Sequence, residues 1–141
     1  MGTSIRLGLA QLVLVGLVLI GCAPALPATT PHPAGTSAGG GARVGEVVTG
    51  IASYYADRFH LRRTASGVPY DKDQLVAAHR SYPFGTVLRV TNLANGRSVT
   101  VRVIDRGPFV EGRILDLSRR AAEELGFIEA GLTEVRIEVI E

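Results

Sequence analysis

The sequence predicts a mainly β fold made of short strands that are joined by tight turns. Apolar and polar residues alternate over residues 98–105 and again over residues 135–139, which is the period of a strand with one buried face. Asn95-Gly96 lies just before the first of these segments and is a strong signal for a two-residue hairpin turn. Together these observations indicate a small β domain in which neighbouring strands pair through hairpins.

Each expected element has a local signal of this kind. The strands are expected, in chain order, at Val47 to Tyr55, Leu75 to His79 (strand or helix), Thr86 to Thr91, Ser98 to Asp105 and Val135 to Val139. One helix is expected to begin after Ser118, which can cap it, and to end at Gly126 in the left-handed conformation. Its residues Ala121, Ala122 and Leu125 would then face the core.

Length and composition exclude several classes of protein. A chain of 141 residues allows at most one folded domain. The formal net charge of +2 is too small to indicate a nucleic-acid-binding protein. The sequence has no internal repeat, no heptad pattern and no zinc-type spacing of cysteine and histidine. We therefore expect a monomer that needs neither a metal nor a cofactor.

The first 45 residues are expected to lie outside the folded domain. Residues 1–21 combine a basic start, a short apolar run and small residues at the end, which is typical of a secretory signal. The ending Leu19-Ile20-Gly21-Cys22 resembles a bacterial lipoprotein signal, which implies cleavage before Cys22 and lipid on that residue. The alternatives are an uncleaved anchor or ordinary cleavage after Ala25. Residues 22–45, rich in Ala, Pro, Thr and Gly, are interpreted as a flexible tether, and residues 46–141 as the domain.

Asp105 is the strongest candidate for chemistry. The alternation over residues 98–105 places its carboxyl group on the same face as the buried valines. Burial disfavours the charged carboxylate, and Gly107-Pro108 then ends the strand. A partly desolvated acid at a strand end is suited to general acid catalysis. The alternative is that Asp105 only caps the turn through backbone hydrogen bonds.

Several short motifs together resemble one family, the rare lipoprotein A (RlpA) proteins, which are septal endolytic peptidoglycan transglycosylases. The motifs are Gly50-Ile51-Ala52-Ser53-Tyr54-Tyr55, Thr64-Ala65-Ser66-Gly67, Ala77-Ala78-His79, Pro83-Phe84-Gly85-Thr86, Val90-Thr91-Asn92, Asn95-Gly96-Arg97, Asp105-Arg106-Gly107-Pro108-Phe109 and Asp116-Leu117-Ser118. The resemblance implies a six-stranded double-psi β-barrel with one or two short helices. It also implies lytic cleavage of peptidoglycan glycan strands between N-acetylmuramic acid and N-acetylglucosamine, by a lipoprotein anchored to the periplasmic or outer face of a bacterial membrane.

The resemblance also assigns roles to individual residues. Asp105 and His79 match the family's catalytic aspartate and histidine. The residues expected to bind the glycan are Tyr54, Tyr70, Arg106 and Phe109. Other interpretations stay open at this point, because His79 could be a hydrogen-bonded core residue and Arg106 could pair with Asp105. The tyrosines could equally belong to the core, and Asp116 is interpreted as a turn or helix-start residue.

The chain departs from the family pattern at two positions. Val68 stands where the family has a glutamate, and Tyr54 stands where many members have tryptophan. Ordinary glycoside hydrolysis uses two carboxylates, whereas a lytic transglycosylase can use one, because the 6-hydroxyl of the muramic acid attacks its own anomeric carbon. Asp105 alone could therefore serve as acid and base. The alternative function is a barrel that binds peptidoglycan without cutting it; an expansin-like loosening protein and a structural partner of cell division rank lower.

Overall fold

The computed structural model describes residues 41–141. The expected signal peptide, the lipidation site Cys22 and most of the expected tether lie outside the described residues. Within 41–141, no helix is both long and apolar enough to cross a membrane.

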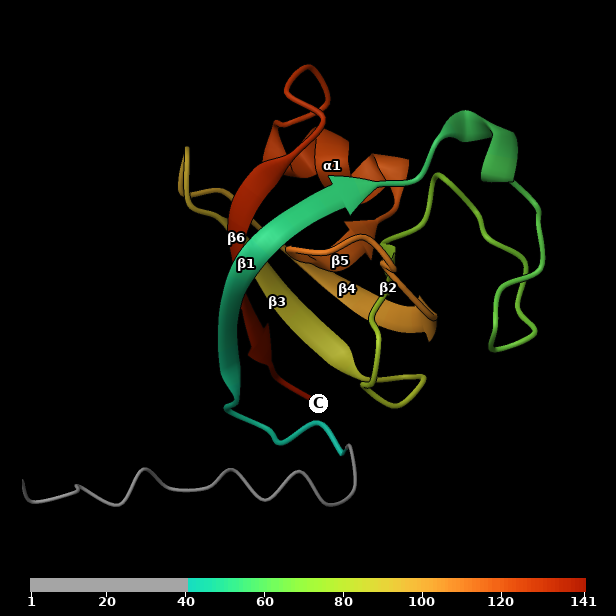
Figure 1. Ribbon diagram of the computed structural model, residues 1–141, viewed down its shortest axis with the longest axis horizontal. Coiled ribbons are helices and arrows are strands. Elements are labelled where there is room, and N and C mark those ends of the chain that lie inside the picture. Colours follow the sequence, from blue (N-terminus) through green and yellow to red (C-terminus); the bar gives the residue numbers. More distant parts are fainter. Residues whose placement is uncertain (1–40) are drawn as a thin grey trace, which may run out of the picture. The chain divides into compact units, whose positions relative to one another are not determined.

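Six strands form a closed barrel around one hydrophobic core, as the resemblance implies (Figure 1). The strands are β1 (Val47–Tyr54), β2 (Val76–Ala78), β3 (Val87–Asn92), β4 (Ser98–Asp105), β5 (Arg113–Leu117) and β6 (Thr133–Val139). Around the barrel they follow the order β1-β5-β2-β4-β3-β6, and β6 pairs with β1 to close it. Closure leaves no unpaired sheet edge among these strands.

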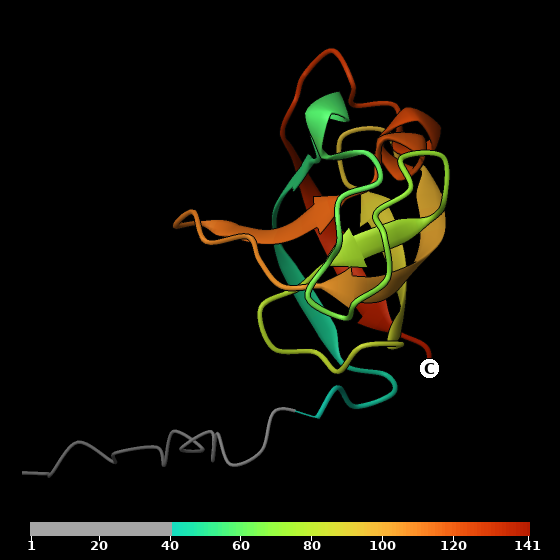
Figure 2. The ribbon, with the colours of Figure 1, turned by 90° about the vertical axis from the view of Figure 1, so that its right-hand side faces the viewer.

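The barrel mixes parallel and antiparallel pairs. Strand β1 runs parallel to β5, and β2 runs parallel to β4, whereas the remaining neighbours are antiparallel. Each parallel pair contains one register shift, between Ile51 and Ala52 in β1 and between Ala77 and Ala78 in β2. Parallel neighbours need long connections. Two long loops of the barrel belong to these connections. The loop between β1 and β2 extends to one side of the barrel in Figure 1, and the loop between β4 and β5 projects from it in Figure 2.

The alternation seen in the sequence defines the core. In β4, Val99, Val101 and Val103 are buried while the residues between them are exposed. Val135 and Ile137 in β6 face the same core. Full burial of each such side chain contributes about 1.5–3 kcal/mol, so these two strands supply much of the barrel's stability.

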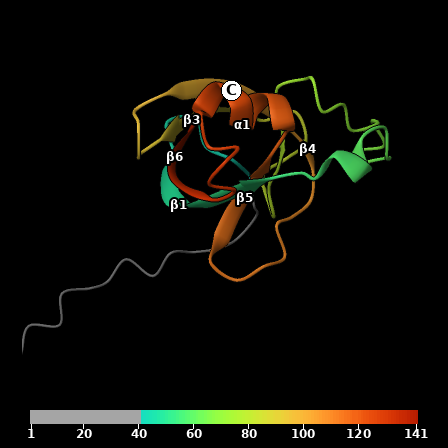
Figure 3. The ribbon, with the colours of Figure 1, turned by 90° about the horizontal axis from the view of Figure 1, so that it is seen from above.

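The expected helix is present as α1 (Arg119–Leu125). The Ser118 side chain accepts a hydrogen bond from the Ala121 amide, and Gly126 ends the helix with a φ of 75°. Ala122 and Leu125 are fully buried against the barrel. In the view from above in Figure 3, α1 lies against the barrel, where it contacts β4 and β1. The cap and the left-handed end therefore follow the sequence signals closely.

Two parts of the sequence-based description need correction or completion. Strand β5 was not expected, and Asp116 lies inside it instead of in a turn or at a helix start. Leu115 and Leu117 of β5 are fully buried, and the strand is central, because it pairs with both β1 and β2. The ambiguous segment from Leu75 to His79 forms a strand, β2. A short 3-10 helix, η1 (Asp57–Phe59), follows β1.

Candidate active site

Asp105 is the last residue of β4, and its carboxylate is held by three donors. Oδ1 accepts hydrogen bonds from the Ala65 and Arg106 backbone amides, each at 2.8 Å. Oδ2 accepts one hydrogen bond, from the Tyr55 hydroxyl at 2.6 Å. The burial expected at this strand end is therefore compensated by donors, and the group is fixed in position. Because Ala65 belongs to the loop between β1 and β2, that loop is tied to the strand end through this carboxylate.

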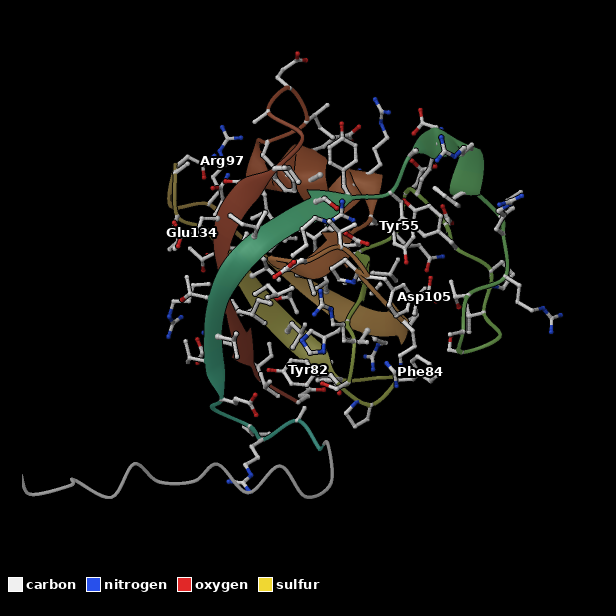
Figure 4. The ribbon with its side chains drawn as sticks, viewed as in Figure 1. Tyr55, Tyr82, Phe84, Arg97, Asp105 and Glu134 are labelled. Atoms are coloured by element: carbon white, nitrogen blue, oxygen red, sulfur yellow. The ribbon has the colours of Figure 1, made fainter. Side chains whose placement is uncertain are left out.

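The Asp105 carboxyl group faces a hollow of about 270 Å³ between this loop and the end of the barrel. The barrel contributes Tyr55 and Asp105 to its lining. The loop contributes Phe59, Arg62, Arg63, Thr64 and Tyr70. Figure 4 shows Tyr55 and Asp105 together on the side of the barrel from which the loop extends. In this hollow, an acid is therefore surrounded by aromatic and basic side chains. Such a lining is suited to bind a sugar that carries polar substituents.

A larger hollow of about 740 Å³ lies on the other side of Tyr55. The two hollows share Tyr55 and Phe59 as lining residues, so they adjoin each other, and they are together called the groove below. The larger part contains a second carboxylate, Asp116, which is hydrogen-bonded by the Ser53 hydroxyl and paired with Arg113 at 2.9 Å. Its side chain is largely buried, with 16% of its surface exposed.

Strand β2 fixes the relation of the two acids. Ala78 pairs with Asp105 of β4 on one side and with Asp116 of β5 on the other. Neighbouring strands lie about 4.8 Å apart, so the backbones of the two acids are separated by roughly two strand spacings. Sequence reasoning missed this relation because it needs β5 in place. The signal that could have found it is the alternation in Ile114-Leu115-Asp116-Leu117, where the leucines face the core.

Within residues 41–141 the His79 ring makes no hydrogen bond to the Asp105 carboxylate and belongs to a separate cluster, although the His79 amide donates to the Asp105 carbonyl oxygen at 3.2 Å. Its ring stacks on Tyr82, with ring centres 3.7 Å apart, and its Nδ1 accepts hydrogen bonds from the Ser81 and Tyr82 amides. Burial, with the charge of Arg106 nearby, lowers the pKa of His79 to about 4. The Tyr82 hydroxyl in turn donates to Glu46 at 2.8 Å. The ring is therefore neutral at pH 7 and held in place, and a catalytic or orienting role of His79 stays a prediction.

Arg106 joins the two clusters without pairing with Asp105. Its guanidinium donates to the carbonyl oxygens of His79 and Tyr82 and lies 3.9 Å from the centre of the Phe84 ring. Its backbone amide is one of the donors to Asp105. Both of these hydrogen bonds come from Nη1, and they support a role in holding the loop after β2 against the end of β4. Direct substrate binding by Arg106 stays a prediction.

The expected glycan-binding aromatic residues differ in exposure. Phe109, in the projecting loop between β4 and β5, is 84% exposed and is free to contact a ligand. Tyr54 lines the larger hollow, where its hydroxyl donates to the Ile128 carbonyl. Tyr70 is only 2% exposed, and its ring packs 4.5 Å from that of Tyr55. The Tyr70 ring therefore packs against the Tyr55 ring and supports it, and it offers no free face for stacking on a sugar.

Val68 lies outside the Asp105 hollow. It is 51% exposed and lines a different, mostly apolar hollow of about 490 Å³ together with Leu75, Val76 and Ile104. That hollow shares no lining residue with the one in front of Asp105. Val68 itself is therefore not part of the lining of the Asp105 hollow.

Comparison with known proteins gives this geometry a context. The lytic transglycolase family model matches residues 47–137. The endolytic peptidoglycan transglycosylase RlpA of Campylobacter jejuni is 53% identical over 97 residues, which cover 69% of this chain and 35% of that protein. RlpA of Pasteurella multocida is 52% identical over 92 residues, which cover 65% of this chain and 31% of that protein. The chain thus spans about a third of the length of these curated relatives.

Solved structures agree on the fold. The Streptomyces papain inhibitor superposes with a TM-score of 0.57 at 24% identity, covering 70% of this chain and 97% of that one. The expansin of Clavibacter michiganensis superposes with a TM-score of 0.54 at 27% identity, covering 68% of this chain and 51% of that one. With a family model that matches most of the folded region and a closed six-stranded barrel of the same kind, this chain belongs to the RlpA family of lytic transglycolase double-psi β-barrel domains.

Proposed function

We propose that this domain is a lytic transglycosylase that cleaves peptidoglycan glycan strands between N-acetylmuramic acid and N-acetylglucosamine. The observation that carries the proposal is the Asp105 carboxyl group, which is fixed by three donors and faces an open, aromatic-walled hollow. Relatives about 50% identical over this region are named endolytic peptidoglycan transglycosylases. Membership of the family and the placement of its aspartate support the same reaction.

One carboxyl group can carry both proton transfers of this reaction. Asp105 gives its proton to the glycosidic oxygen, so that the bond between the muramic acid anomeric carbon and that oxygen breaks. The 6-hydroxyl of the same muramic acid then bonds to the anomeric carbon, and its proton returns to Asp105. The products are an anhydro-muramic end and a free 4-hydroxyl on N-acetylglucosamine. No water is consumed, and the acid ends in its starting state.

The other residues of the groove assist this step. Asp116 supplies a second negative charge, and a carboxylate there stabilises the positive charge that develops at the anomeric carbon. Tyr54 and Phe109 provide aromatic surfaces for the sugar rings. His79 acts as a positioning residue, because its Nδ1 holds the loop whose carbonyl oxygens anchor Arg106.

Incubation of the purified full chain with cell-wall sacculi tests the proposal. Mass spectrometry of the soluble products is expected to find anhydro-muropeptides. Asp105→Asn removes the carboxyl proton that the proposed reaction transfers, so the initial rate is expected to fall about 10²- to 10⁴-fold. Glu134→Gln, which changes an exposed carboxyl group on the opposite side of the barrel in Figure 4, is the matched control and should keep the wild-type rate.

The same experiment separates the enzyme from a binding module. If the protein sediments with sacculi but releases no anhydro product, it binds peptidoglycan without cutting it. Retention of full activity in Asp105→Asn would leave the enzyme standing and remove Asp105 from its assigned role.

The proposal places the domain in a bacterial cell envelope, as a monomer attached to a membrane through lipid on Cys22. The signal-like sequence before Cys22 supports this location. Several acyl chains on one residue hold a protein on a bilayer where a single chain does not. Metabolic labelling with palmitate should mark the wild-type chain and leave Cys22→Ser unlabelled, and light scattering of the purified protein should give the monomer mass.

A further inference from the structure

The two oxygens of Asp105 are not equivalent. Oδ1 accepts from two backbone amides, which are fixed donors and cannot turn away. An oxygen in that position has no room for a proton of its own. Oδ2 has one partner, the Tyr55 hydroxyl at 2.6 Å. The proton that Asp105 gives and takes back must therefore reside on Oδ2, beside Tyr55.

A hydroxyl group can serve both protonation states of that oxygen. It donates to Oδ2 when the carboxyl group is charged, and by rotating about its C–O bond it accepts from Oδ2 when the proton is present. A backbone amide or an arginine can only donate. Burial and the nearby Asp105 raise the pKa of Tyr55 well above 10, so its own proton stays in place throughout the range in which Asp105 works.

The ring of Tyr55 is fixed while its hydroxyl is free to turn. Its backbone amide donates to the Leu117 carbonyl at 3.0 Å, directly after β1. The ring packs 4.5 Å from Tyr70 and 5.9 Å from Phe59. Tyr55 also lines both parts of the groove, of which one contains Asp105 and the other Asp116. A bond on which both acids act would therefore lie close to Tyr55.

We propose that Tyr55 is the positioning residue of the acid, which holds the transferable oxygen of Asp105 and exchanges donor and acceptor roles with it during one turnover. This inference rests on the proposed function, because it assigns a partner to the proton that the reaction moves. The other ionisable and charged groups around the pair are Asp116 of β5, the loop residues Tyr70, Arg62 and Arg63, and Arg106 after β4. None of them donates a side-chain hydrogen bond to Asp105 within residues 41–141.

Tyr55→Phe tests this role, because it removes the hydroxyl and keeps the ring packing. We expect kcat to fall about 10- to 100-fold with KM within twofold of wild type, since the ring surfaces are unchanged. Asp105 must start protonated, and its charged form loses one donor in this variant, so the alkaline limb of the kcat profile should move to higher pH by roughly 0.5 to 1 unit. A loss through repacking alone would lower the rate without moving that limb.

Tyr82→Phe is the matched control. It also removes one tyrosine-to-carboxylate hydrogen bond, from Tyr82 to Glu46, at a similar distance but away from the groove. It should keep kcat within twofold and leave the alkaline limb of the kcat profile in place. Equal effects of both variants, or an unchanged rate and profile in Tyr55→Phe, would overturn the proposal.

A measurement without turnover separates this inference from the proposed reaction. The ¹³C resonance of the Asp105 carboxyl group can be titrated in the full chain whether or not sacculi are cleaved. Its midpoint should rise in Tyr55→Phe and stay constant in Tyr82→Phe. If Tyr55→Phe does not fold, 3-fluorotyrosine in place of Tyr55 keeps the ring and strengthens the donor, so the midpoint should fall instead. An unchanged midpoint in the folded variant would refute the role of Tyr55 even if the enzyme is active.

Discussion

The Asp105 and His79 regions contain similar groups in opposite settings. In each, a tyrosine hydroxyl donates to a carboxylate, from Tyr55 to Asp105 and from Tyr82 to Glu46. The first pair lines an open groove, whereas the second lies under a stacked histidine ring. The resemblance to RlpA assigns catalysis to both regions. From their different surroundings we expect that the first performs chemistry and that the second holds the loop that supports it.

Removal of the His79 ring tests most directly whether this region is structural or catalytic. His79→Ala loses the stack on Tyr82 and leaves the Ser81 and Tyr82 amides without their acceptor. We expect the free energy of unfolding to fall by about 2–3 kcal/mol in urea titrations. The rate per folded molecule should stay within about fivefold of wild type, because the ring is not among the hydrogen-bond donors to the Asp105 carboxylate.

His79→Phe divides that effect into its parts, because it keeps an aromatic ring on Tyr82 and removes only the acceptor. It should recover part of the lost stability. A stable His79→Phe or His79→Ala protein with a rate more than a hundredfold below wild type would return His79 to the catalytic machinery.

Mild acid should weaken the His79 region before it affects the fold elsewhere. The pKa of His79 is lowered to about 4 in the folded protein, against an ordinary value of 6.5. The unfolded chain therefore binds more protons between these two values, so stability is fully present above pH 6.5 and is lost as the pH falls towards 4. Because the ring is partly exposed, we expect a loss of only about 1–2 kcal/mol over this range. Urea titrations at pH 7 and pH 4.5 measure it, and a loss of the same size in His79→Phe would assign it to other groups.

Val68→Glu should have the smallest effect. It restores the residue that the family has at this position, but its side chain would enter the separate apolar hollow next to Leu75 and Ile104. We expect the rate of anhydro-muropeptide release to change less than threefold. A gain of tenfold or more would mean that position 68 reaches the Asp105 groove when substrate is bound, and would favour the view that the natural chain is a weak enzyme or a binder.

The strands and helix with strong local patterns could be predicted from sequence. Strand β4 follows its valine alternation residue by residue, and α1 begins and ends at its cap signals. Strand β5 was missed because it has only five residues, two of which are charged. Its alternation of apolar and polar residues is too short to identify a strand from the sequence alone. Only pairing with β1 and β2 makes it a central strand.

The candidate site was predictable in its residue types but not in its arrangement. Asp105 was identified from its place after the valines, and its neighbour Tyr55 was visible only as one of several tyrosines. The separation of His79 from Asp105 depends on which way each side chain leaves its strand and on the turn after β2. The shared groove beside Asp116 depends on strands that are distant in the sequence. Such relations are tertiary, and no local pattern encodes them.

Ala78 has a consequence for how this kind of domain can change over time. The spacing between Asp105 and Asp116 is set by the width of one short strand, β2, which lies between them. This strand is buried, and Ala78 itself carries only a methyl group. The loops that surround the groove can lengthen, shorten or exchange residues without altering that spacing. New ligand preferences can therefore evolve at the rim while the reactive geometry is inherited intact, whereas a bulky residue at position 78 would disturb both acids at once.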